Sequence, residues 1–294
     1  MHEPSDRLSV QLTPQFESVQ AHYDLSEDFH RLFLDPTQTY SCAYFERDDM
    51  TLEEAQIAKI DMALGELNLL PGMTLLDIGC GWGATMRRAI EKYDVNVIGL
   101  TLSENQAAHV QKMFEEMDSP RSRRVLSQGW EQFDEPADRI VSIGAFEHFG
   151  HERYARFFEM AYNTLPADGV MLLQSIVRAT FKERRRLGLP TTADLVHFIQ
   201  FILDEIFPGG WLSTVPTIEE HAVRAGFTVT RIRSMQPHYA KTLDMWAAAL
   251  EANKDRAIPL QSLQVYDRYI KYLTACANLF REGYTDVYQF TLAK

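Results

Sequence analysis

A short apolar run that leads directly into a glycine-rich turn constrains the fold of this chain more than any other feature. Residues Met73–Ile78 (MTLLDI) follow Pro71-Gly72 and precede GCGWG. This pattern is typical of a strand buried on both faces. Helical sequence follows from about Ala84 to Lys92. A buried strand joined to a helix by such a turn predicts an α/β fold.

Strands and helices continue to alternate after this unit. Ser103 is placed to cap a helix that runs to about Met117, and another helix is expected near Glu152–Leu165. Alternation of this length predicts a mostly parallel sheet with helices on both faces. The other predicted strands are Val95–Leu100, Arg124–Leu126, Arg139–Ile143, Val170–Val177, Phe227–Arg233 and Val287–Leu292. Two helical stretches are expected between the last two of them.

The chain is predicted to form a single catalytic domain. Its 294 residues are 46% hydrophobic and 24% charged, a balance typical of globular proteins that excludes disorder. Neither an internal repeat nor a Gly/Ser-rich linker divides it. We divide residues 1–294 into a mostly helical N-terminal lid (1–71), a ligand-binding core (72–179), a helical insertion (180–215) and a C-terminal part of the core (216–294).

The insertion carries a broad apolar stripe at roughly helical spacing. The stripe either packs on the core or lines a hydrophobic slot beside the ligand site, and the pattern alone leaves both readings open. Its members are Leu195, Phe198, Ile199, Ile202, Ile206 and Phe207.

Charge and cysteine content exclude several classes of protein. The net charge of −12 disfavours binding to a nucleic-acid backbone. The cysteines Cys42, Cys80 and Cys276 are far apart and contain no CxxC pair, so a disulfide framework or cysteine-rich zinc site is not expected. No apolar run has the length of a signal peptide or a membrane span. We therefore expect a cytoplasmic protein.

The glycine spacing distinguishes between nucleotide ligands. Asp77-Ile-Gly-Cys-Gly-Trp-Gly83 has GxGxG where dinucleotide-binding turns need GxGxxG. The GK[ST] ending of a phosphate-binding P-loop is also missing, because Ala84-Thr85 follows Gly83. The turn fits S-adenosylmethionine methyltransferases, in which an acid at the position of Asp77 suits an amine-bearing ligand. A plain tight turn between strand and helix is the alternative.

The adenosine contacts are less clear from the sequence. Many methyltransferases place an acid after the second strand to hold the ribose, but here Leu100-Thr101-Leu102-Ser103 follows. Thr101 and Gln106 are the polar candidates there. Trp130 could cover the adenine ring and Glu131 could accept its amino hydrogens, although either could equally be an ordinary loop anchor.

Six segments resemble the mycolic acid cyclopropane synthases, a family of S-adenosylmethionine-dependent enzymes that modify double bonds in meromycolic chains. The resemblance covers nearly the whole chain and looks closest to the branch that makes the proximal cyclopropane of α-mycolates. The segments are TYSCAYFERDDMTLEEAQ (39–56), LLDIGCGWG (75–83), VNVIGLTLSENQ (95–106), GAFEHFGHERY (144–154), EIFPGGWL (205–212) and QPHYAKTLDMWA (236–247).

The resemblance implies a class I methyltransferase fold, which is a Rossmann-like, mostly parallel seven-stranded sheet. It adds an N-terminal helical lid and an insertion after the fifth strand that flanks an acyl tunnel. The cofactor residues that it implies are Tyr40, Ser41, Leu75, Leu76, Asp77, Ile78, Gly79, Cys80, Gly81, Trp82, Gly83, Thr101, Leu102, Ser103, Glu104, Asn105, Gln106, Trp130 and Glu131.

A bound bicarbonate or carbonate is also implied, beside the reacting methyl group. Its ligands match Cys42, Glu147, Tyr239 and the Ile143 backbone. The family's cysteine near the C-terminus, which the resemblance offers as a catalytic candidate, matches Cys276; a place in the core is the alternative that we favour for it.

One position departs from the family pattern. The usual motif LLHTI supplies a histidine to the anion, whereas this chain reads Leu172-Leu173-Gln174-Ser175-Ile176. The Gln174 amide can donate a hydrogen bond to an anion, but it lacks the charge assistance of a histidinium. Gln174 therefore either weakens the anion site or is a neutral variant.

The chemistry explains why aromatic side chains are expected around the substrate. Methyl transfer to an isolated alkene leaves a carbocation, which aromatic faces stabilise without reacting with it. The candidates are Tyr23, Tyr40, Phe149, Phe207 and Phe280. A mild base must then remove a proton, and Glu147 would hold a bicarbonate through that anion's own hydroxyl, since two bare anions repel. His148 and His151 lack a third ligand at a suitable spacing, so no metal is expected.

The sequence thus predicts cyclopropanation of a cis double bond in a long acyl chain. A methyl-branched or hydroxylated product, or a non-catalytic lipid-binding homologue, remains an alternative, while the glycine spacing disfavours a nicotinamide-dependent oxidoreductase. An acidic acyl carrier protein would need a local positive patch. The densest cluster is Lys182, Arg184, Arg185 and Arg186, which either docks the carrier or is a solvated helix face.

Overall fold

A seven-stranded sheet organises the computed structural model, which describes residues 27–294. The strands lie in the order β3-β2-β1-β4-β5-β7-β6. The first five run parallel, and β7 lies antiparallel between β5 and β6. The mostly parallel seven-stranded sheet is therefore confirmed. The strands are β1 (Thr74–Ile78), β2 (Asn96–Thr101), β3 (Arg123–Ser127), β4 (Arg139–Ile143), β5 (Val170–Arg178), β6 (Thr228–Ser234) and β7 (Thr285–Ala293).

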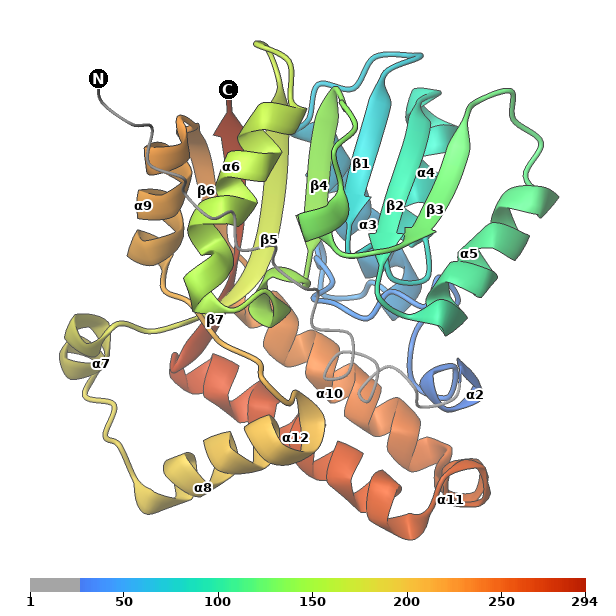
Figure 1. Ribbon diagram of the computed structural model, residues 1–294. Coiled ribbons are helices and arrows are strands. Elements are labelled where there is room, and N and C mark those ends of the chain that lie inside the picture. The colour runs from blue at the N-terminus through green and yellow to red at the C-terminus, as the bar shows by residue number, and fades with distance from the viewer. Residues whose placement is uncertain (1–26) are drawn as a thin grey trace, which may run out of the picture.

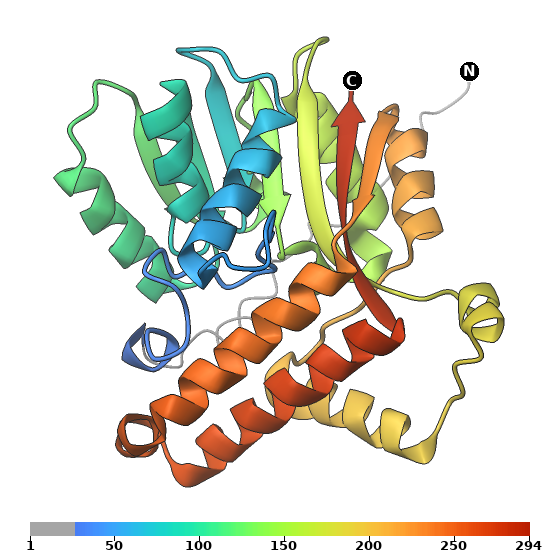
Figure 2. The same ribbon diagram turned by 180° about the vertical axis from the view of Figure 1, so that it is seen from behind.

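Helices cover both faces of the sheet, as expected (Figures 1 and 2). Three helices pack on one face, where apolar side chains such as Ile60, Met86 and Phe114 meet the strands. They are α3 (Leu52–Gly65), α4 (Ala84–Tyr93) and α5 (Glu104–Glu116). The other face is covered by α6 (Tyr154–Thr164) and α9 (Val215–Ala225), which bury Phe157 and Ile218.

A further helical layer lies beyond the carboxyl ends of the parallel strands (Figure 1). It contains α2 (Glu27–His30), α10 (Gln236–Ala252), α11 (Lys254–Leu260) and α12 (Leu263–Glu282). Three helices therefore separate β6 from β7, where the sequence suggested two. Pro259 removes a backbone donor near the end of α11, and Ser262 accepts a hydrogen bond from the Val265 amide to start α12.

The described part of the expected N-terminal lid is less helical than predicted. Residues 1–26 lie outside the described residues, and residues 31–51 form turns and irregular chain before α3 begins. The carboxylate of Asp35 accepts hydrogen bonds from the backbone N–H groups of Thr37 (2.9 Å) and Thr39 (3.1 Å). Such local bonds satisfy the backbone without a helix.

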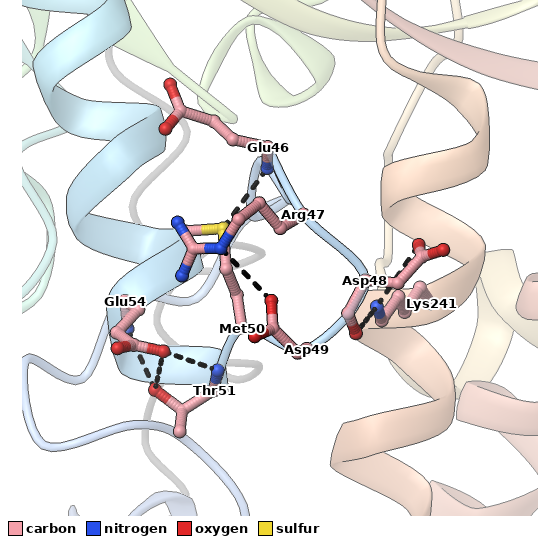
Figure 3. Close-up of polar contacts among 8 residues, drawn as sticks. All are labelled: Glu46, Arg47, Asp48, Asp49, Met50, Thr51, Glu54 and Lys241. Atoms are coloured by element: carbon pink, nitrogen blue, oxygen red, sulfur yellow. Dashed lines mark hydrogen bonds and ion pairs between the residues drawn. The ribbon is translucent and has the colours of Figure 1, made fainter.

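The loop before α3 fastens this segment to α10 (Figure 3). The Lys241 ammonium donates a hydrogen bond to the Asp48 carbonyl oxygen at 2.8 Å. Thr51 and Glu54 form a capping box that fixes the first turn of α3. The preceding segment is held between the same helices, because Gln56 of α3 donates to the Ser41 carbonyl oxygen at 2.8 Å and the Ala43 amide donates to Thr242 of α10 at 3.1 Å.

The insertion consists of α7 (Phe181–Leu187), α8 (Ala193–Phe201) and the π-helical turn η4 (Ile202–Ile206). It follows β5 and lies beside the end of α12 (Figures 1 and 2). Leu195 and Ile206 of the apolar stripe are buried, and Ile206 packs against the α10–α12 layer.

Substitution of Gly79 should show how closely the turns after β1 and β4 approach each other. Gly79 has φ +81°, and a Cβ there would lie 2.4 Å from the Ala145 Cβ. We expect Gly79→Ala to lower the free energy of unfolding by about 3 kcal/mol, because it combines a backbone strain with a collision between the turns. Urea denaturation measures this change.

Gly81→Ala is the matched control. Gly81 also has positive φ (+54°), but an added Cβ would have no heavy atom within 4 Å. Gly81→Ala should lower the free energy of unfolding by about 1 kcal/mol, from backbone strain alone. Equal losses in the two variants would contradict the close approach of the two turns.

Candidate active site

Two adjoining cavities lie at the carboxyl ends of the parallel strands, the usual location of ligand sites in such sheets. The glycine-turn cavity, of about 140 Å³, is lined by the turns after β1, β2 and β4. The apolar cavity, of about 340 Å³, lies between β5, the insertion, α10 and α12. Both are lined by Tyr40, Ser41, Gly144 and His148. A ligand in one cavity can therefore reach a ligand in the other.

Most of the predicted cofactor residues line the glycine-turn cavity. These are Tyr40, Ser41, Asp77, Ile78, Gly79, Cys80, Gly81, Trp82, Thr101, Leu102, Gln106, Trp130 and Glu131. Six others do not line it: Leu75, Leu76, Gly83, Ser103, Glu104 and Asn105. Leu75 and Leu76 are core residues of β1, whereas Gly83 and Ser103 are the N-caps of α4 and α5. Glu104 and Asn105 are exposed on the first turn of α5.

Asp77 is a buried carboxylate at the end of β1, 3% exposed. Its Oδ2 atom has no hydrogen-bond partner among residues 27–294. Burial raises the pKa of Asp77 to about 7, because the charged form loses solvation. A cationic group on a ligand would satisfy this oxygen, which supports the role expected of Asp77 from the sequence.

Lys59 is a cavity residue that the sequence analysis missed. It is fully buried on α3 and donates a hydrogen bond to the Ser41 hydroxyl at 2.8 Å. Burial lowers its pKa to about 8, and the nearby Asp77 opposes this shift. A signal was present, because Lys59 is four residues from both Ala55 and Ala63 on the buried side of the helix.

The other side of the glycine-turn cavity is polar and aromatic. The Thr101 hydroxyl donates to the Gln106 side-chain oxygen at 2.8 Å. The short 3₁₀ helix η1 (Trp130–Gln132) buries the Trp130 ring against the cavity. Arg153 donates to Glu131 at 3.0 Å, so Glu131 is held in an ion pair. Gln38, Thr39, Gln128 and Gly129 also line this cavity and were not expected from the sequence.

The apolar stripe of the insertion lines the apolar cavity through Phe198, Ile199, Ile202 and Phe207. Leu195 lines it as well, whereas Ile206 does not. The structure therefore favours the reading of the stripe as a slot wall. An apolar cavity of this size suits a hydrocarbon chain.

Of the predicted tunnel aromatics, Phe207 and Phe280 line the apolar cavity. Tyr23 lies outside the described residues. The prediction for Phe149 is wrong, because this residue lines the glycine-turn cavity instead. The 3₁₀ helix η2 (Phe146–His148) ends beside it, and its ring lies 5.7 Å from the Trp130 ring.

Glu147 lies on η2 and is the carboxyl group beside the junction, which is the place where the two cavities meet. Its Oε1 accepts a hydrogen bond from the Ile176 amide at 2.6 Å, while its Oε2 is buried without a partner in the described part of the chain. Desolvation raises the pKa of Glu147 above its usual value. Its free oxygen can therefore accept a hydrogen bond or, when protonated, donate one.

Four other predicted catalytic residues line the same cavity as Glu147: Cys42, Gln174, Tyr239 and Cys276. Ile143 lines the glycine-turn cavity instead and lies beside Gln174 in the β4–β5 register. The Gln174 side-chain oxygen accepts a hydrogen bond from Gln289 at 3.0 Å. This contact leaves the Gln174 amide nitrogen as the group available to a ligand.

The thiols and His148 are neutral in this environment. Burial raises the pKa of Cys276 to about 12 and that of Cys42 further above its usual value. Neither cysteine is therefore a thiolate nucleophile near neutral pH. Burial lowers the pKa of His148 to about 4, so its ring carries no charge. No cluster of three potential metal ligands occurs among residues 27–294.

Sequence comparisons connect this site with one family. A model of the mycolic acid cyclopropane synthetase family matches residues 10–290. Cyclopropane mycolic acid synthase 3 of Mycobacterium tuberculosis is 76% identical over 287 residues, which cover 98% of this chain and 100% of that protein. Cyclopropane mycolic acid synthase MmaA2 of the same organism is 69% identical over 283 residues, 96% of this chain and 99% of that protein.

Comparison with solved structures points to the same family. The cyclopropane synthase MmaA2 from Mycobacterium tuberculosis superposes with a TM-score of 0.96 at 69% identity, covering 96% of this chain and 99% of that one. Mycolic acid cyclopropane synthase CmaA1, complexed with SAH and CTAB, gives a TM-score of 0.94 at 68% identity over 96% of this chain and 99% of that one. Coclaurine N-methyltransferase, at 20% identity and a TM-score of 0.82, shares the fold.

The buried carboxylate of Asp77 should make ligand affinity depend on pH. S-adenosylhomocysteine carries an ammonium group, and Asp77 must be ionised to attract it. We expect affinity to rise up to about tenfold per pH unit below the Asp77 pKa of about 7, and to level off above it. Isothermal titration calorimetry between about pH 5.5 and 8 measures this profile.

Asp77→Asn should bind more weakly and abolish the slope, since the amide does not titrate. Asp118→Asn, at an exposed position after α5, should leave both affinity and slope as in the unsubstituted protein. A flat profile in the unsubstituted protein would exclude Asp77 as the partner of the ammonium.

Proposed function

The chain belongs to the mycolic acid cyclopropane synthetase family, and we propose that it transfers a methylene group from S-adenosyl-L-methionine to a cis double bond of a long acyl chain, forming a cyclopropane. The meromycolic chains of mycolic acid biosynthesis are the proposed substrates, with the proximal position of α-mycolates as the site of reaction. The observation that carries this proposal is the meeting of the two cavities at Tyr40, Ser41, Gly144 and His148.

The glycine-turn cavity has the groups that S-adenosylmethionine needs. Its free carboxylate oxygen, on Asp77, suits the ammonium group of the ligand. Gln106 and Trp130 provide an amide and an aromatic surface for the adenosine. When bound, S-adenosylmethionine supplies an electrophilic methyl group, so the residues at the junction mainly have to align the alkene with it.

The apolar cavity is lined mainly by apolar side chains, and several of these are aromatic rings that can face a positive charge. Tyr239 and Phe280 contact each other at 4.7 Å between ring centroids, and Tyr272 contacts Phe207 at 5.6 Å. All four line the cavity. Burial keeps the pKa of Tyr239 and Tyr272 well above the usual value, so both are neutral phenols. These rings can stabilise a carbocation by cation–π attraction without trapping it.

Glu147 and Gln174 would hold a bicarbonate, which would supply a mild base for the proton lost in ring closure. The free Oε2 of Glu147 and the available amide nitrogen of Gln174 both belong to the lining of the apolar cavity. Glu147 accepts a hydrogen bond from the hydroxyl of the anion or, in its protonated form, donates one to it. The second arrangement relieves the repulsion that the sequence analysis foresaw, because the pKa of Glu147 is raised.

The carrier of the acyl chain is proposed to be an acyl carrier protein. Lys182, Arg185 and Arg186 are exposed on α7, and Arg184 on the same helix lines the apolar cavity. These cations complement an acidic partner in a chain that is otherwise acidic. None of the helices formed by residues 27–294 combines the length and apolar character needed to cross a membrane. The three free cysteines fit a reducing cytoplasm.

Product analysis tests the reaction. The protein should convert a cis-unsaturated acyl thioester and S-adenosylmethionine to a product heavier by one CH₂ that resists hydrogenation, detected by mass spectrometry. Glu147→Ala should lower the rate of product formation by about 100-fold, since proton transfer loses its anion site. A methyl-branched or hydroxylated product would replace the cyclopropane assignment with one of those alternatives.

Glu152→Ala is the control, because Glu152 belongs to the same segment but has a side chain that is 68% exposed. It should leave the rate unchanged, and both variants should bind S-adenosylhomocysteine as the unsubstituted protein does. An equal loss of rate in the two variants would exclude a specific role for Glu147.

Gln174→His tests whether this chain has a weakened anion site. Gln174 is 2% exposed, so a histidine there would be desolvated and neutral, as His148 is. We expect the turnover number to change by less than about fivefold, the worth of one neutral hydrogen bond. A larger gain in steady-state turnover would show that glutamine disables the site and would favour the lipid-binding alternative.

A further inference from the structure

Within residues 27–294, Arg178 and Arg184 differ from most arginines in lacking an acidic partner. Thirteen arginines among residues 27–294, such as Arg88 and Arg121, form an ion pair with a carboxylate. Within residues 27–294, neither Arg178 nor Arg184 forms an ion pair. In a chain with a net charge of −12, two guanidinium groups without an acidic partner in the described part of the chain call for an explanation.

Both arginines line the apolar cavity. Arg178 is the last residue of β5, four residues beyond Gln174. At about 3.3 Å per residue, its Cα lies about 13 Å from that of Gln174. The two guanidinium groups therefore mark a cationic region at a distance from the junction, in a cavity whose wall is otherwise largely apolar.

Aromatic rings and backbone atoms hold the two guanidinium groups in place. The Arg184 guanidinium lies 5.6 Å from the centroid of the Tyr284 ring, and the Arg178 guanidinium lies 6.0 Å from that of Trp211. Arg184 also donates to the Thr191 hydroxyl at 2.5 Å, and Arg178 to the Leu212 carbonyl oxygen at 3.2 Å. Such stacking fixes the orientation of the planar groups before a ligand binds.

Donor capacity remains after these contacts. The Nε of Arg184 is buried and has no hydrogen-bond partner in the described part of the chain. A buried donor without a partner is costly, and a guanidinium fork matches the oxygens of a carboxylate or phosphate. The Tyr284 hydroxyl donates to the Pro190 carbonyl oxygen at 2.8 Å, so this ring is itself anchored to the loop after α7.

We propose that Arg178 and Arg184 form a subsite for the anionic polar end of the acyl ligand, whose hydrocarbon chain occupies the apolar cavity. The anion is a carboxylate of a free acid or the phosphate of a phosphopantetheine thioester, which present the same oxygen chemistry to a guanidinium. This inference rests on the proposed acyl substrate and adds the recognition of its head group.

Two matched pairs of probes test the subsite by isothermal titration calorimetry below the critical micelle concentration. Oleate is compared with methyl oleate, and oleoyl-phosphopantetheine with oleoyl-pantetheine. The unsubstituted protein should bind the anionic member of at least one pair about tenfold more tightly, the worth of one charge-assisted hydrogen bond. The pair that is discriminated identifies the source of the anion.

Arg184→Gln should remove this preference and leave the affinity for the uncharged probe unchanged. Arg184→Lys should keep part of the preference, because it retains the charge but loses the fork. Arg256→Gln is the control, because Arg256 is exposed on α11 and its side chain bonds only to Asn253 among residues 27–294. This variant should keep the full preference. Thermal unfolding and S-adenosylhomocysteine binding verify that every variant is folded.

Equal affinity for both members of each pair in the unsubstituted protein would overturn the subsite, and so would a preference that survives Arg184→Gln. The proposed function fails in a different way. If the anionic preference is present but no product heavier by one CH₂ forms from oleoyl-phosphopantetheine, the subsite stands and the reaction assignment is wrong.

Discussion

The close contact between the turns after β1 and β4 is the constraint on which the rest of this site depends. A Cβ on Gly79 would lie only 2.4 Å from that of Ala145, so the two turns meet with no room for a side chain. The first turn provides Asp77 to the glycine-turn cavity, and the second leads through Gly144 to Glu147 in the apolar cavity. If the two turns separated, Asp77 in the glycine-turn cavity would move away from Glu147 in the apolar cavity.

Buried charge is concentrated at this contact. Asp77, Lys59 and Glu147 are all removed from solvent. Burial raises the pKa of the two acids and lowers that of the lysine, which favours the neutral form of each. A protein gains no stability from such groups unless they are paired. Free oxygens on Asp77 and Glu147 are therefore best understood as places where ligands complete the hydrogen bonding. Stability is sacrificed here for a site that is organised before binding.

The antiparallel strand β7 has a role beyond closing the sheet. It places Gln289 opposite Gln174, and the hydrogen bond between the two amides orients Gln174 at the junction. It also brings Thr285 opposite Arg178 at the far end of β5, beside Tyr284. One strand pairing thus arranges both the proposed anion site at the reaction centre and the proposed head-group subsite.

Local sequence determined the buried strands, the glycine-rich turn and the helix caps, because each depends on neighbouring residues. The cap at Ser103 and the strand Thr74–Ile78 lie where the pattern predicts them. The family motifs supplied the residues around Glu147 and Gln174. Helical spacing places Lys59 on the buried side of α3. Tertiary structure alone decided that Lys59 lies near Asp77, that Phe149 faces Trp130 rather than the apolar cavity, and that Arg178 and Arg184 lie beside Trp211 and Tyr284. Those contacts join residues distant in the chain, and the space left between packed elements sets them, which no local periodicity encodes.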